Sequence, residues 1–469
     1  MKAVGRVGGW AANKAVLALV LLPVCPATRL SAQDTSAIDR GVRVGIIYRP
    51  GIRPGLAVLP GRGAGLDSVR VIVARDLDYS DRFEVITLPA GDSLRVSATP
   101  TVARAATGGE RAGRSGGATA DLNYPLYQAL GADFAVALAL RGDTTVVTVH
   151  DIAAGGVRRE FRARLPALKD PGFRLAVHRL SDRILEATLG VAGIAATRIL
   201  FVMDGKVYVI DQDGAERKLV SSSDHQAMSP AWGPDGRRFG YMEFRAGHGQ
   251  LFVQDLASVQ RRPVVTTGKA LDFTPAFSPD GETLAFSRAT EEGTDIYTVN
   301  IKDNCCLQRL TVGRFSDNLS PTYSPDGQRV AFVSTRPGLP QVYVMAADGT
   351  DQQLFAPFDY GVTGSSNAPD WSPDGQSVAF HRDVGGTLQI FVLDVRTRAV
   401  RQLTSLGRNE DPTWAPDSRH LAFVSDRSGY RQLWIIDLET GRIRPLLQQS
   451  GARLPAWSPR LPEATSSTP

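Results

Sequence analysis

Histidine is the residue type in this sequence with the broadest chemistry, because imidazole serves as a general base and as a metal ligand near neutral pH. Six histidines occur among the 469 residues. They are scattered, and no group of them has the spacing of a zinc site. We interpret each one as a surface or packing residue, and we expect neither a bound metal nor a cofactor. The six are His150, His178, His225, His248, His381 and His420.

A serine nucleophile is suggested at one place. Gly113-Arg114-Ser115-Gly116-Gly117 has the spacing of a nucleophile elbow. That motif needs a strand before it and a helix after it. Residues 97–120 are instead rich in Gly, Ala, Ser, Thr and Arg without periodicity, and they predict a disordered insertion. The sequence also lacks a phosphate-binding loop and a dinucleotide fingerprint. We therefore predict that the protein is not an enzyme.

A ring of carboxylates is a third candidate chemistry, because an aspartate recurs within a repeated turn. The proline before it presets φ for the first central turn position, and the glycine after it suits the end of the turn. An aspartate in such a turn accepts hydrogen bonds from nearby turn amides. We expect this local role rather than catalysis. The aspartates are Asp235, Asp280, Asp326, Asp374 and Asp417.

The turn belongs to a longer repeat, of which Ser320-Pro321-Thr322-Tyr323-Ser324-Pro325-Asp326-Gly327 is one copy. Each copy opens with a Pro-x-aromatic strand, and an apolar strand follows its turn. Successive aromatic residues lie 45, 46, 48, 43 and 43 positions apart, which is the period of a four-stranded propeller blade. We expect these aromatic side chains to pack between blades. They are Trp232, Phe277, Tyr323, Trp371, Trp414 and Trp457.

The two ends of the repeat region predict how the ring closes. Residues 198–203 and 206–210 supply later strands of a blade that lacks its Pro-x-aromatic strand, and residues 454–459 supply that strand alone. The last strand therefore completes the first blade and leaves no open sheet edge. We predict a six-bladed all-β propeller over residues 196–461, with a disordered tail at 462–469.

The chain before residue 196 has a different pattern. Residues 1–33 have a basic start and an apolar run too short to span a bilayer, and they predict a cleavable signal peptide. A lipoprotein signal through Cys25 is the weaker alternative, because Val24 rather than a small residue precedes the cysteine. Residues 34–195 mix strands with helices, expected at 66–77, 124–130 and 172–189, and predict an α/β domain. The predicted fold class is therefore multidomain.

Charge and cysteine content narrow the possible partners. Without the four basic residues of the signal, the chain has 49 Lys and Arg against 48 Asp and Glu. This balance gives no reason to expect a nucleic acid partner.

The mature chain keeps Cys305 and Cys306, and because adjacent cysteines rarely pair we expect no disulfide framework.

The candidate binding residues lie in the polar loops just before each Pro-x-aromatic strand. In a closed ring these loops meet at one end of the central channel, and binding residues concentrate on loops held by a rigid scaffold. Such a group could recognise a protein loop or hold a cation, and ordinary loop polarity remains the alternative for any single residue. The candidates are His225, Gln226, Asp272, Asp317, Asn318, Asn367, Asn409, Glu410, Asp411 and Arg453.

The repeats resemble the PD40 (WD40-like) β-propeller repeat, and residues 40–461 resemble the TolB family of the Tol–Pal cell-envelope system. The six repeats and the chain end around Trp457-Ser458-Pro459 carry the resemblance, together with Ile72-Val73-Ala74-Arg75-Asp76-Leu77 and Ala129-Leu130-Gly131-Ala132-Asp133. The insertion at 97–120 and the loop at 268–273 depart from the family pattern.

The resemblance implies a monomeric, non-enzymatic periplasmic scaffold. Its propeller would bind the outer-membrane peptidoglycan-associated lipoprotein Pal, and it would support outer-membrane integrity and envelope constriction at cell division. The family engages the inner-membrane protein TolA through the mature N-terminus, but residues 34–40 show no match to that segment, so this partner stays open. The competing hypothesis is a propeller that gates a secreted peptidase or lyase. It requires a Ser/Asp/His set in an accompanying hydrolase domain, and residues 40–195 lack that signature.

Overall fold

The computed structural model describes residues 53–61, 63, 65–86, 88, 122–245, 248–264, 270–314, 316–358 and 363–462. The predicted signal peptide, the insertion at 97–120 and the tail from residue 463 lie outside the described residues. The described residues all belong to one compact unit, Tyr48–Pro469. Among them, no helix combines the length and apolar character needed to cross a membrane.

The first described elements form a five-stranded sheet in the order β2-β1-β3-β4-β5. Strand β1 runs parallel to β2 and β3, whereas β3, β4 and β5 form an antiparallel meander. This mixture of parallel and antiparallel pairs is typical of small α/β domains. The strands are β1 (Gly55–Val58), β2 (Glu84–Ile86), β3 (Phe134–Arg141), β4 (Thr144–Asp151) and β5 (Gly156–Ala163).

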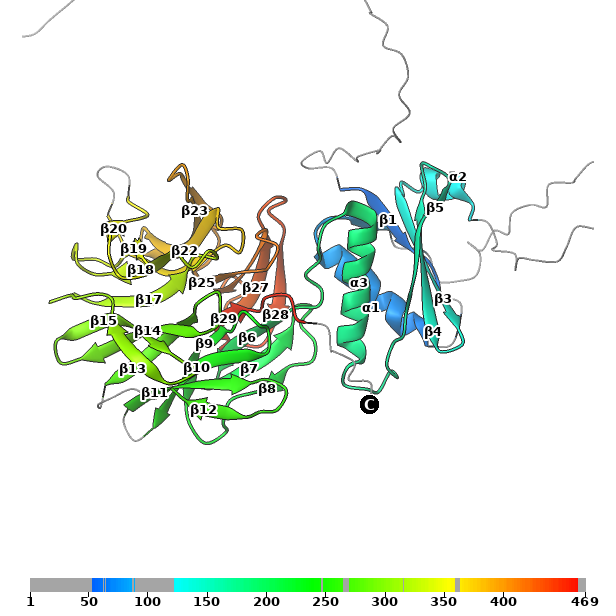
Figure 1. Ribbon diagram of the computed structural model, residues 1–469. Coiled ribbons are helices and arrows are strands. Elements are labelled where there is room, and N and C mark those ends of the chain that lie inside the picture. The colour runs from blue at the N-terminus through cyan, green and yellow to red at the C-terminus, as the bar shows by residue number, and fades with distance from the viewer. Residues whose placement is uncertain are drawn as a thin grey trace, which may run out of the picture. The chain divides into compact units, whose positions relative to one another are not determined.

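Two long helices cover one face of this sheet (Figure 1), α1 (Leu66–Tyr79) and α3 (Phe173–Leu189). Their buried residues follow helical spacing and share a core with sheet residues such as Phe134, as the apolar pattern predicts. Helix α3 ends at Gly190, whose φ of 71° lies in the left-handed region that glycine adopts without strain. A short helix, α2 (Tyr124–Ala129), packs in a separate cluster with β1 and β3.

Among the described residues, the remaining strands form six four-stranded antiparallel sheets, the predicted blades. Each runs outward from the Pro-x-aromatic strand, with one blade assembled from both ends of the repeat region. The first two blades are β29 (Arg453–Trp457), β6 (Arg198–Met203), β7 (Lys206–Asp211) and β8 (Lys218–Leu219), then β9 (Ala227–Trp232), β10 (Arg238–Arg245), β11 (His248–Asp255) and β12 (Arg261–Pro263).

The other four blades follow the chain without exchange of strands. The third and fourth are β13 (Leu271–Phe277), β14 (Thr283–Thr290), β15 (Gly293–Asn300) and β16 (Cys305–Arg309), then β17 (Asn318–Tyr323), β18 (Arg329–Ser334), β19 (Gln341–Ala346) and β20 (Gln353–Leu354). The last two are β21 (Ser366–Trp371), β22 (Ser377–Val384), β23 (Thr387–Asp394) and β24 (Val400–Gln402), then β25 (Asn409–Trp414), β26 (His420–Ser425), β27 (Gln432–Asp437) and β28 (Ile443–Leu447).

Ring closure occurs as the sequence predicts, because β29 pairs with β6 and places Trp457 opposite Ile199. Two hydrogen bonds between Arg198 and Ser458 hold the join: the Arg198 N–H donates to the Ser458 side-chain Oγ at 3.0 Å, and the Ser458 N–H donates to the Arg198 carbonyl at 2.8 Å. The Trp457 indole N–H donates to Thr197 Oγ1 at 2.8 Å. The first blade is therefore complete only when the last strand is present.

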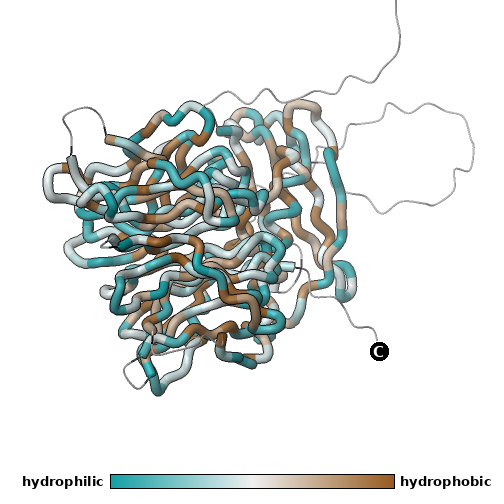
Figure 2. Tube along the Cα trace, turned by 60° about the vertical axis from the view of Figure 1, so that its left-hand side comes forward, coloured by the Kyte–Doolittle hydropathy of each residue, from teal (hydrophilic) through white to brown (hydrophobic). Residues whose placement is uncertain are grey.

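Apolar side chains of the middle strands are buried, and Figure 2 shows hydrophobic and hydrophilic stretches alternating along the chain. Phe332, Phe380 and Phe423 are each 0% exposed. Full burial of such a side chain contributes about 1.5–3 kcal/mol. Trp371 packs in one cluster with Val342 of the preceding blade, so the predicted packing of the aromatic residues between blades is confirmed there.

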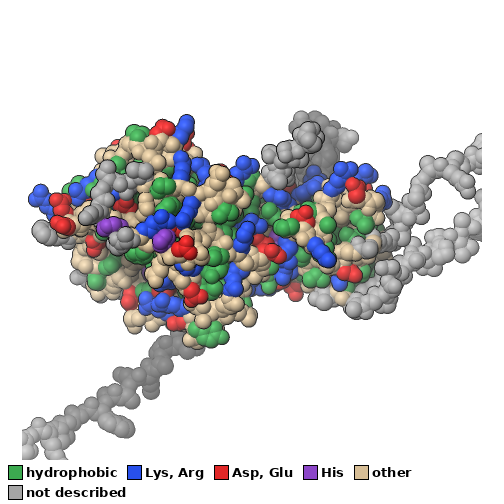
Figure 3. Space-filling model, turned by 90° about the horizontal axis from the view of Figure 1, so that it is seen from below, with side chains coloured by type: hydrophobic (Ala, Val, Ile, Leu, Met, Phe, Trp, Pro, Cys, Tyr) green, Lys and Arg blue, Asp and Glu red, His purple; other side chains and the backbone are tan. Residues whose placement is uncertain are grey.

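On the surface, charged side chains of both signs are interspersed over the face shown in Figure 3.

The aspartates of the repeated turn accept hydrogen bonds from turn amides, as predicted. In three copies the side chain accepts from the backbone N–H two positions later, at 2.9–3.0 Å; these are Asp280, Asp326 and Asp374. Asp235 and Asp417 accept two consecutive N–H groups each. These bonds satisfy turn donors that the strand ladder leaves free.

The cysteines depart from the expectation. Cys305 and Cys306 form a disulfide between adjacent residues at the exposed start of β16, so the expectation that they stay unpaired is wrong. In a regular strand, neighbouring side chains point to opposite faces and cannot meet. Cys306 instead has a φ of 62°, and this left-handed backbone breaks the alternation.

Candidate functional site: the channel and the loop face

The six innermost strands share one backbone feature, a left-handed residue directly before the proline. The register of pairing with the second strand shifts at or beside this point in every blade. Such a β-bulge takes one residue out of the ladder and changes where its neighbours point. The φ values are 53° at Ser229, 46° at Thr274, 53° at Ser320, 50° at Ala368, 55° at Asp411 and 51° at Leu454.

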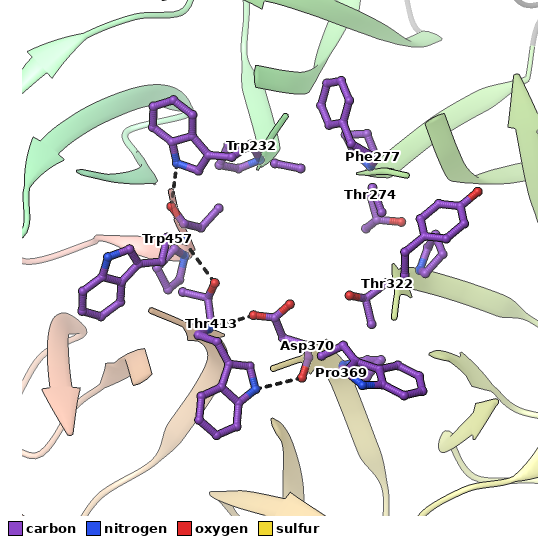
Figure 4. Close-up of a pocket in the computed structure, with 18 of the residues that line it drawn as sticks. Trp232, Thr274, Phe277, Thr322, Pro369, Asp370, Thr413 and Trp457 are labelled. Atoms are coloured by element: carbon purple, nitrogen blue, oxygen red, sulfur yellow. Dashed lines mark hydrogen bonds between the residues drawn. The ribbon is translucent and has the colours of Figure 1, made fainter. Parts of the chain in front are cut away.

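The innermost strands surround a channel of about 430 Å³. Proline, alanine, threonine and aromatic residues make up most of its wall, and Figure 4 shows Thr322, Asp370 and Thr413 along one part of it. The two lining residues with ionisable carboxyl groups are Asp370 and Asp411. They lie in neighbouring blades, so the acidic character of the channel is concentrated on one side.

Asp370 connects its blade to the next one. Its Oδ2 accepts the backbone N–H of Trp414 at 2.8 Å, and its carbonyl accepts the Trp414 indole N–H at 3.1 Å. Burial raises the pKa of Asp370 to about 6, although hydrogen bonds from Trp414, Thr413 and Thr322 act in the opposite direction. Thr413 has the equivalent place in the following blade, where its Oγ1 accepts the Trp457 N–H at 3.2 Å.

Asp411 lies in a bulge at the channel wall. Burial raises its pKa to about 7, the negative charge of Glu410 adds to this, and a hydrogen bond from the Leu454 backbone opposes it. The backbone N–H of Asp411 donates to Nδ1 of His381 at 3.1 Å. Burial also lowers the pKa of His381 to about 4, with Arg408 acting in the same direction, so this imidazole is neutral at pH 7.

Three of the predicted binding residues, Asp272, Asn318 and Asn409, are 0–1% exposed. Each holds an arginine from the second strand of its own blade or the turn after it: Asp272 binds Arg288 at 2.8 Å, Asn318 binds Arg336 at 3.1 Å, and Asn409 binds Arg427 at 2.9 Å. These guanidinium groups also lie 4.6–5.7 Å from the centroids of aromatic rings in the same blade. The polar side chains thus shape the loops from inside, and their part in binding stays a prediction.

The other predicted residues are more accessible. Gln226 and Arg453 are exposed, and His225, Asp317, Asn367, Glu410 and Asp411 are partly exposed. Glu410 bridges Arg408 and Arg431, each at 3.2 Å. The Asp317 N–H donates to Thr335 Oγ1 at 2.7 Å, and the His225 carbonyl accepts from Lys206 Nζ at 2.5 Å. These bonds keep the loops in place around the channel.

One end of the propeller, here called the loop face, carries the loops before the innermost strands and the turns between second and third strands. Backbone bonds join the two sets, from Phe244 to Gln226 at 2.9 Å and from Thr335 to Asp317 at 2.9 Å. Large apolar side chains are exposed in these segments, a feature that the sequence search for polar residues missed. They are Phe244 (38%), Val312 (73%), Leu339 (49%), Val384 (45%), Leu406 (66%) and Tyr430 (54%).

The opposite end, here called the turn face, contacts the α/β domain through charged residues. Arg442 binds Asp78 at 2.7 Å and Asp81 at 3.0 Å. Arg419 donates to the Asp81 carbonyl at 3.0 Å. In a second cluster, Asp213 pairs with both Arg75 and Arg174. Among the described residues, the cluster that holds the core of the α/β sheet includes no propeller residue. The contacts across this boundary include these ion pairs and the Arg444 guanidinium, which lies 4.0 Å from the centroid of the Tyr79 ring.

One group at this boundary has the composition of a metal site, since ligand atoms of Asp76, His178 and Asp213 lie within 4.8 Å of one another. His178 Nδ1 already contacts Asp76 at 2.8 Å. Burial lowers the pKa of His178, but Asp211, Asp76 and Asp213 outweigh it and raise the value to about 10. Arg75 and Arg174 both pair with Asp213, so protein groups already engage the ligand atoms of this cluster.

Ser181, His178 and Asp76 do not form a nucleophilic triad. Ser181 Oγ donates to Asp76 at 2.7 Å instead of to His178, and these three side chains are buried. A Ser-His-Asp relay needs the histidine between the other two residues and an accessible serine. No sequence signal pointed to this cluster, because its members are far apart along the chain.

Comparison with known proteins agrees with the fold and the repeat. The TolB β-propeller domain family, PD40, matches residues 185–359 and 360–463. The Tol-Pal system protein TolB of Bordetella pertussis is 31% identical over 182 residues, which cover 38% of this chain and 41% of the relative. The TolB of Bordetella bronchiseptica gives the same figures. The chain thus spans about two fifths of the length of these curated relatives.

A solved structure extends the likeness over more of the chain. The crystal structure of TolB from Acinetobacter baumannii superposes with a TM-score of 0.71 and 24% identity, and it covers 87% of this chain and 98% of that one. At this identity the likeness concerns the fold. The family match itself covers more than half of the sequence, including the strand that closes the ring. The chain belongs to the TolB β-propeller family.

Proposed function

We propose that the protein is a non-enzymatic, periplasmic interaction scaffold of the Tol–Pal system that binds the peptidoglycan-associated lipoprotein Pal through its loop face. Family membership and the names of the curated relatives support the Tol–Pal assignment. The apolar N-terminal run of residues 15–24 supports export. Through this binding the protein would contribute to outer-membrane integrity and to envelope constriction at cell division.

The exposed apolar residues of the loop face are the observation that carries the proposal. Leu406 is 66% exposed and Val312 is 73% exposed, and both lie in loops that precede innermost strands. Large apolar side chains exposed at one end of the propeller, with polar groups around them, support an interaction surface there. The turn face, by contrast, already uses its arginines and aspartates to contact the α/β domain.

The loop face has the properties that protein recognition requires. Its loops are held by buried arginine contacts and backbone bonds, so little conformational freedom is lost on binding. Apolar groups such as Tyr430 can exclude water, while Asn367 and Arg453 can supply hydrogen bonds at the rim. The inner-membrane protein TolA is a second proposed partner. It would contact the N-terminal segment, which lies outside the described residues.

Capture of the lipoprotein tests the proposal directly. The mature chain is immobilised, and purified peptidoglycan-associated lipoprotein and a detergent extract of cell envelope are passed over it. We expect retention by the wild type and a loss of about tenfold or more in affinity for the Leu406→Ser/Tyr430→Ser variant, because buried apolar anchors carry most of an interface's binding energy.

Val259→Ser provides the matched control, since Val259 is 58% exposed in the turn between β11 and β12 at the other end of the blade. This variant should bind like the wild type. A wild-type chain that retains no peptidoglycan-associated lipoprotein contradicts the Tol–Pal assignment. Equal losses in the control and in the loop-face variant contradict the choice of face.

A further inference from the structure

The third blade carries two adjacent cysteines on its outer edge. Cys305 and Cys306 begin β16, the outermost strand of that blade, and both side chains are exposed. They form a disulfide with each other. The next residue, Leu307, is also 37% exposed. Exposed disulfides are the labile ones, because a thiolate can reach a sulfur atom directly. The pair is therefore open to attack by an external thiol.

The backbone turn that holds the pair also occurs in blades that have no cysteine there. In the third blade the turn has left-handed residues at Asn304 and Cys306, with φ of 49° and 62°. The turns between the third and fourth strands of the first and fourth blades have left-handed residues at the same spacing. These are Gly214 with Glu216 and Gly349 with Asp351. The conformation that lets the two sulfur atoms meet is thus a property of the turn and does not require the disulfide.

Hydrogen bonds hold the turn and the strand without the sulfur atoms. Asn300 Oδ1 accepts the backbone N–H groups of Lys302 and Asp303 at 3.0 Å and 3.2 Å. At the other end of β16, Arg309 Nε donates to Asp295 Oδ2 at 3.1 Å. We therefore expect the turn to persist when the disulfide is reduced. The two thiols then stay side by side, and closing the bond again needs little further ordering of the chain.

We propose that Cys305 and Cys306 form a reversible redox site that exchanges with the dithiol of an oxidoreductase. A thiolate of the dithiol attacks one sulfur of the pair, so that a mixed disulfide forms and the other cysteine leaves as a thiolate and takes up a proton. The second thiol of the dithiol then breaks the mixed disulfide. The dithiol leaves as a disulfide, and its two electrons and two protons are now on the two cysteines.

The adjacency of the two cysteines selects a dithiol over a single thiol. After attack by a single thiol, the freed cysteine lies beside the mixed disulfide and expels the attacking group again. A neighbouring group reacts at an effective concentration far above that of a second external thiol. A dithiol overcomes this reversal because its own second thiol is also held close to the mixed disulfide. Since adjacent residues close almost no loop, this site differs from a disulfide that serves to stabilise the fold.

Alkylation followed by mass spectrometry of the folded full chain tests the site. Dithiothreitol without denaturant should reduce the pair completely, and glutathione at the same thiol concentration should act about tenfold more slowly, because its mixed disulfide is reversed. The reduced protein is then treated with glutathione disulfide. The wild type should recover its own disulfide. The matched variant Cys306→Ser leaves Cys305 without a neighbouring thiol, so it should accumulate about tenfold more mixed disulfide than the wild type.

Three results would overturn the proposal. Reduction that requires denaturant would mean that the sulfur atoms are inaccessible. Equal amounts of mixed disulfide in the wild type and in Cys306→Ser would mean that the two thiols do not meet, and reduction by glutathione as fast as by dithiothreitol would remove the preference for a dithiol. Hydrogen exchange of residues 305–309 compares the two redox forms. Unchanged protection supports the proposal, whereas a loss of protection on reduction contradicts it, because the bond would then be needed to hold the strand.

Discussion

His420 of the propeller and Asp81 of the α/β domain meet at a buried boundary, with 3.3 Å between Nε2 and Oδ2. The Nδ1 atom of the same ring contacts Asp417 of the repeated turn at 2.7 Å. One imidazole thus joins a turn of the propeller to the turn that follows α1. Asp81 also contacts Arg442 at 3.0 Å, so one carboxylate is shared by two basic residues of the propeller.

Asp81→Asn should destabilise the protein and loosen the boundary. The substitution keeps a side chain that tolerates the φ of 54° at this position, but it leaves Arg442 and His420 without their shared negative charge. Removing one partner of a buried ion pair costs about 3–5 kcal/mol, and we expect somewhat less here because Arg442 is partly exposed.

Calorimetry checks this prediction. We expect the single transition of the wild type to broaden or divide as the two domains unfold less cooperatively. Asp67→Asn is the control, because Asp67 is an exposed residue of the first turn of α1. A variant with wild-type unfolding behaviour would mean that the shared carboxylate does not stabilise the boundary.

The His420 charge should make stability fall in alkaline solution. Burial lowers the pKa of His420, but Asp417, Asp81 and Asp437 outweigh it and raise the value to about 9, against about 6.5 in the unfolded chain. The folded state therefore binds the proton more tightly. Its contribution, about 3 kcal/mol, is fully present below pH 6.5 and is lost as pH rises towards 9.

Urea unfolding between pH 6 and pH 9.5 measures this dependence. His420→Gln should be less stable than the wild type at pH 6, and the difference should shrink as pH rises. The pKa of His178 is also raised, to about 10. This group contributes equally in both proteins, so it does not affect the difference between them. Parallel curves for the two proteins would argue against a charged His420.

Asp370→Asn should, in contrast to His420→Gln, increase the free energy of unfolding at pH 8. The pKa of Asp370 is raised by burial to about 6, so its ionisation opposes folding above that pH, and the penalty disappears as pH falls from 6 towards 4. Asparagine keeps an oxygen for the Trp414 N–H. We expect a gain of about 1–2 kcal/mol at pH 8 and none at pH 4 in urea unfolding. A loss at pH 8 would show that the channel needs the charge.

The closing strand should stabilise the whole propeller. Trp457 is 6% exposed and packs with Ala415 and Ala422 of the neighbouring blade. Trp457→Ala should cost about 3–5 kcal/mol through the cavity that it leaves. Trp457→Phe keeps most of the packing and loses the bond to Thr197, so it should cost about 1 kcal/mol. Denaturant titration gives both values, and similar costs for the two variants would contradict the packing explanation.

The disulfide between Cys305 and Cys306 should contribute little to stability. A bond between adjacent residues closes almost no loop of the unfolded chain, so it removes little entropy. Replacing both cysteines by serine should change the free energy of unfolding by less than about 0.5 kcal/mol. Mass spectrometry after alkylation, with and without prior reduction, shows whether the pair is oxidised in the protein.

The repeat architecture could be deduced from sequence because local chemistry specifies it. Pro325, Asp326 and Gly327 fit a tight turn by their own backbone preferences, and the copies of this turn recur at blade spacing. The isolated strand at Trp457 likewise predicted closure, since a blade without its first strand leaves an edge that only this strand can fill. Helices α1 and α3 followed from apolar spacing for the same reason.

The side-chain environments were decided by the tertiary structure. Asn318 and Asn409 appear in the sequence as polar loop residues, yet both are buried. In each case an arginine of the same blade packs on aromatic rings and donates a hydrogen bond to the amide oxygen of the asparagine. Leu406 and Val312 appear as ordinary apolar residues, yet they are exposed because their loops project from the ring. The ion pairs of Asp81 with His420 and Arg442 join residues more than 300 positions apart, and sequence spacing carries no information about contacts that form only when two domains pack together.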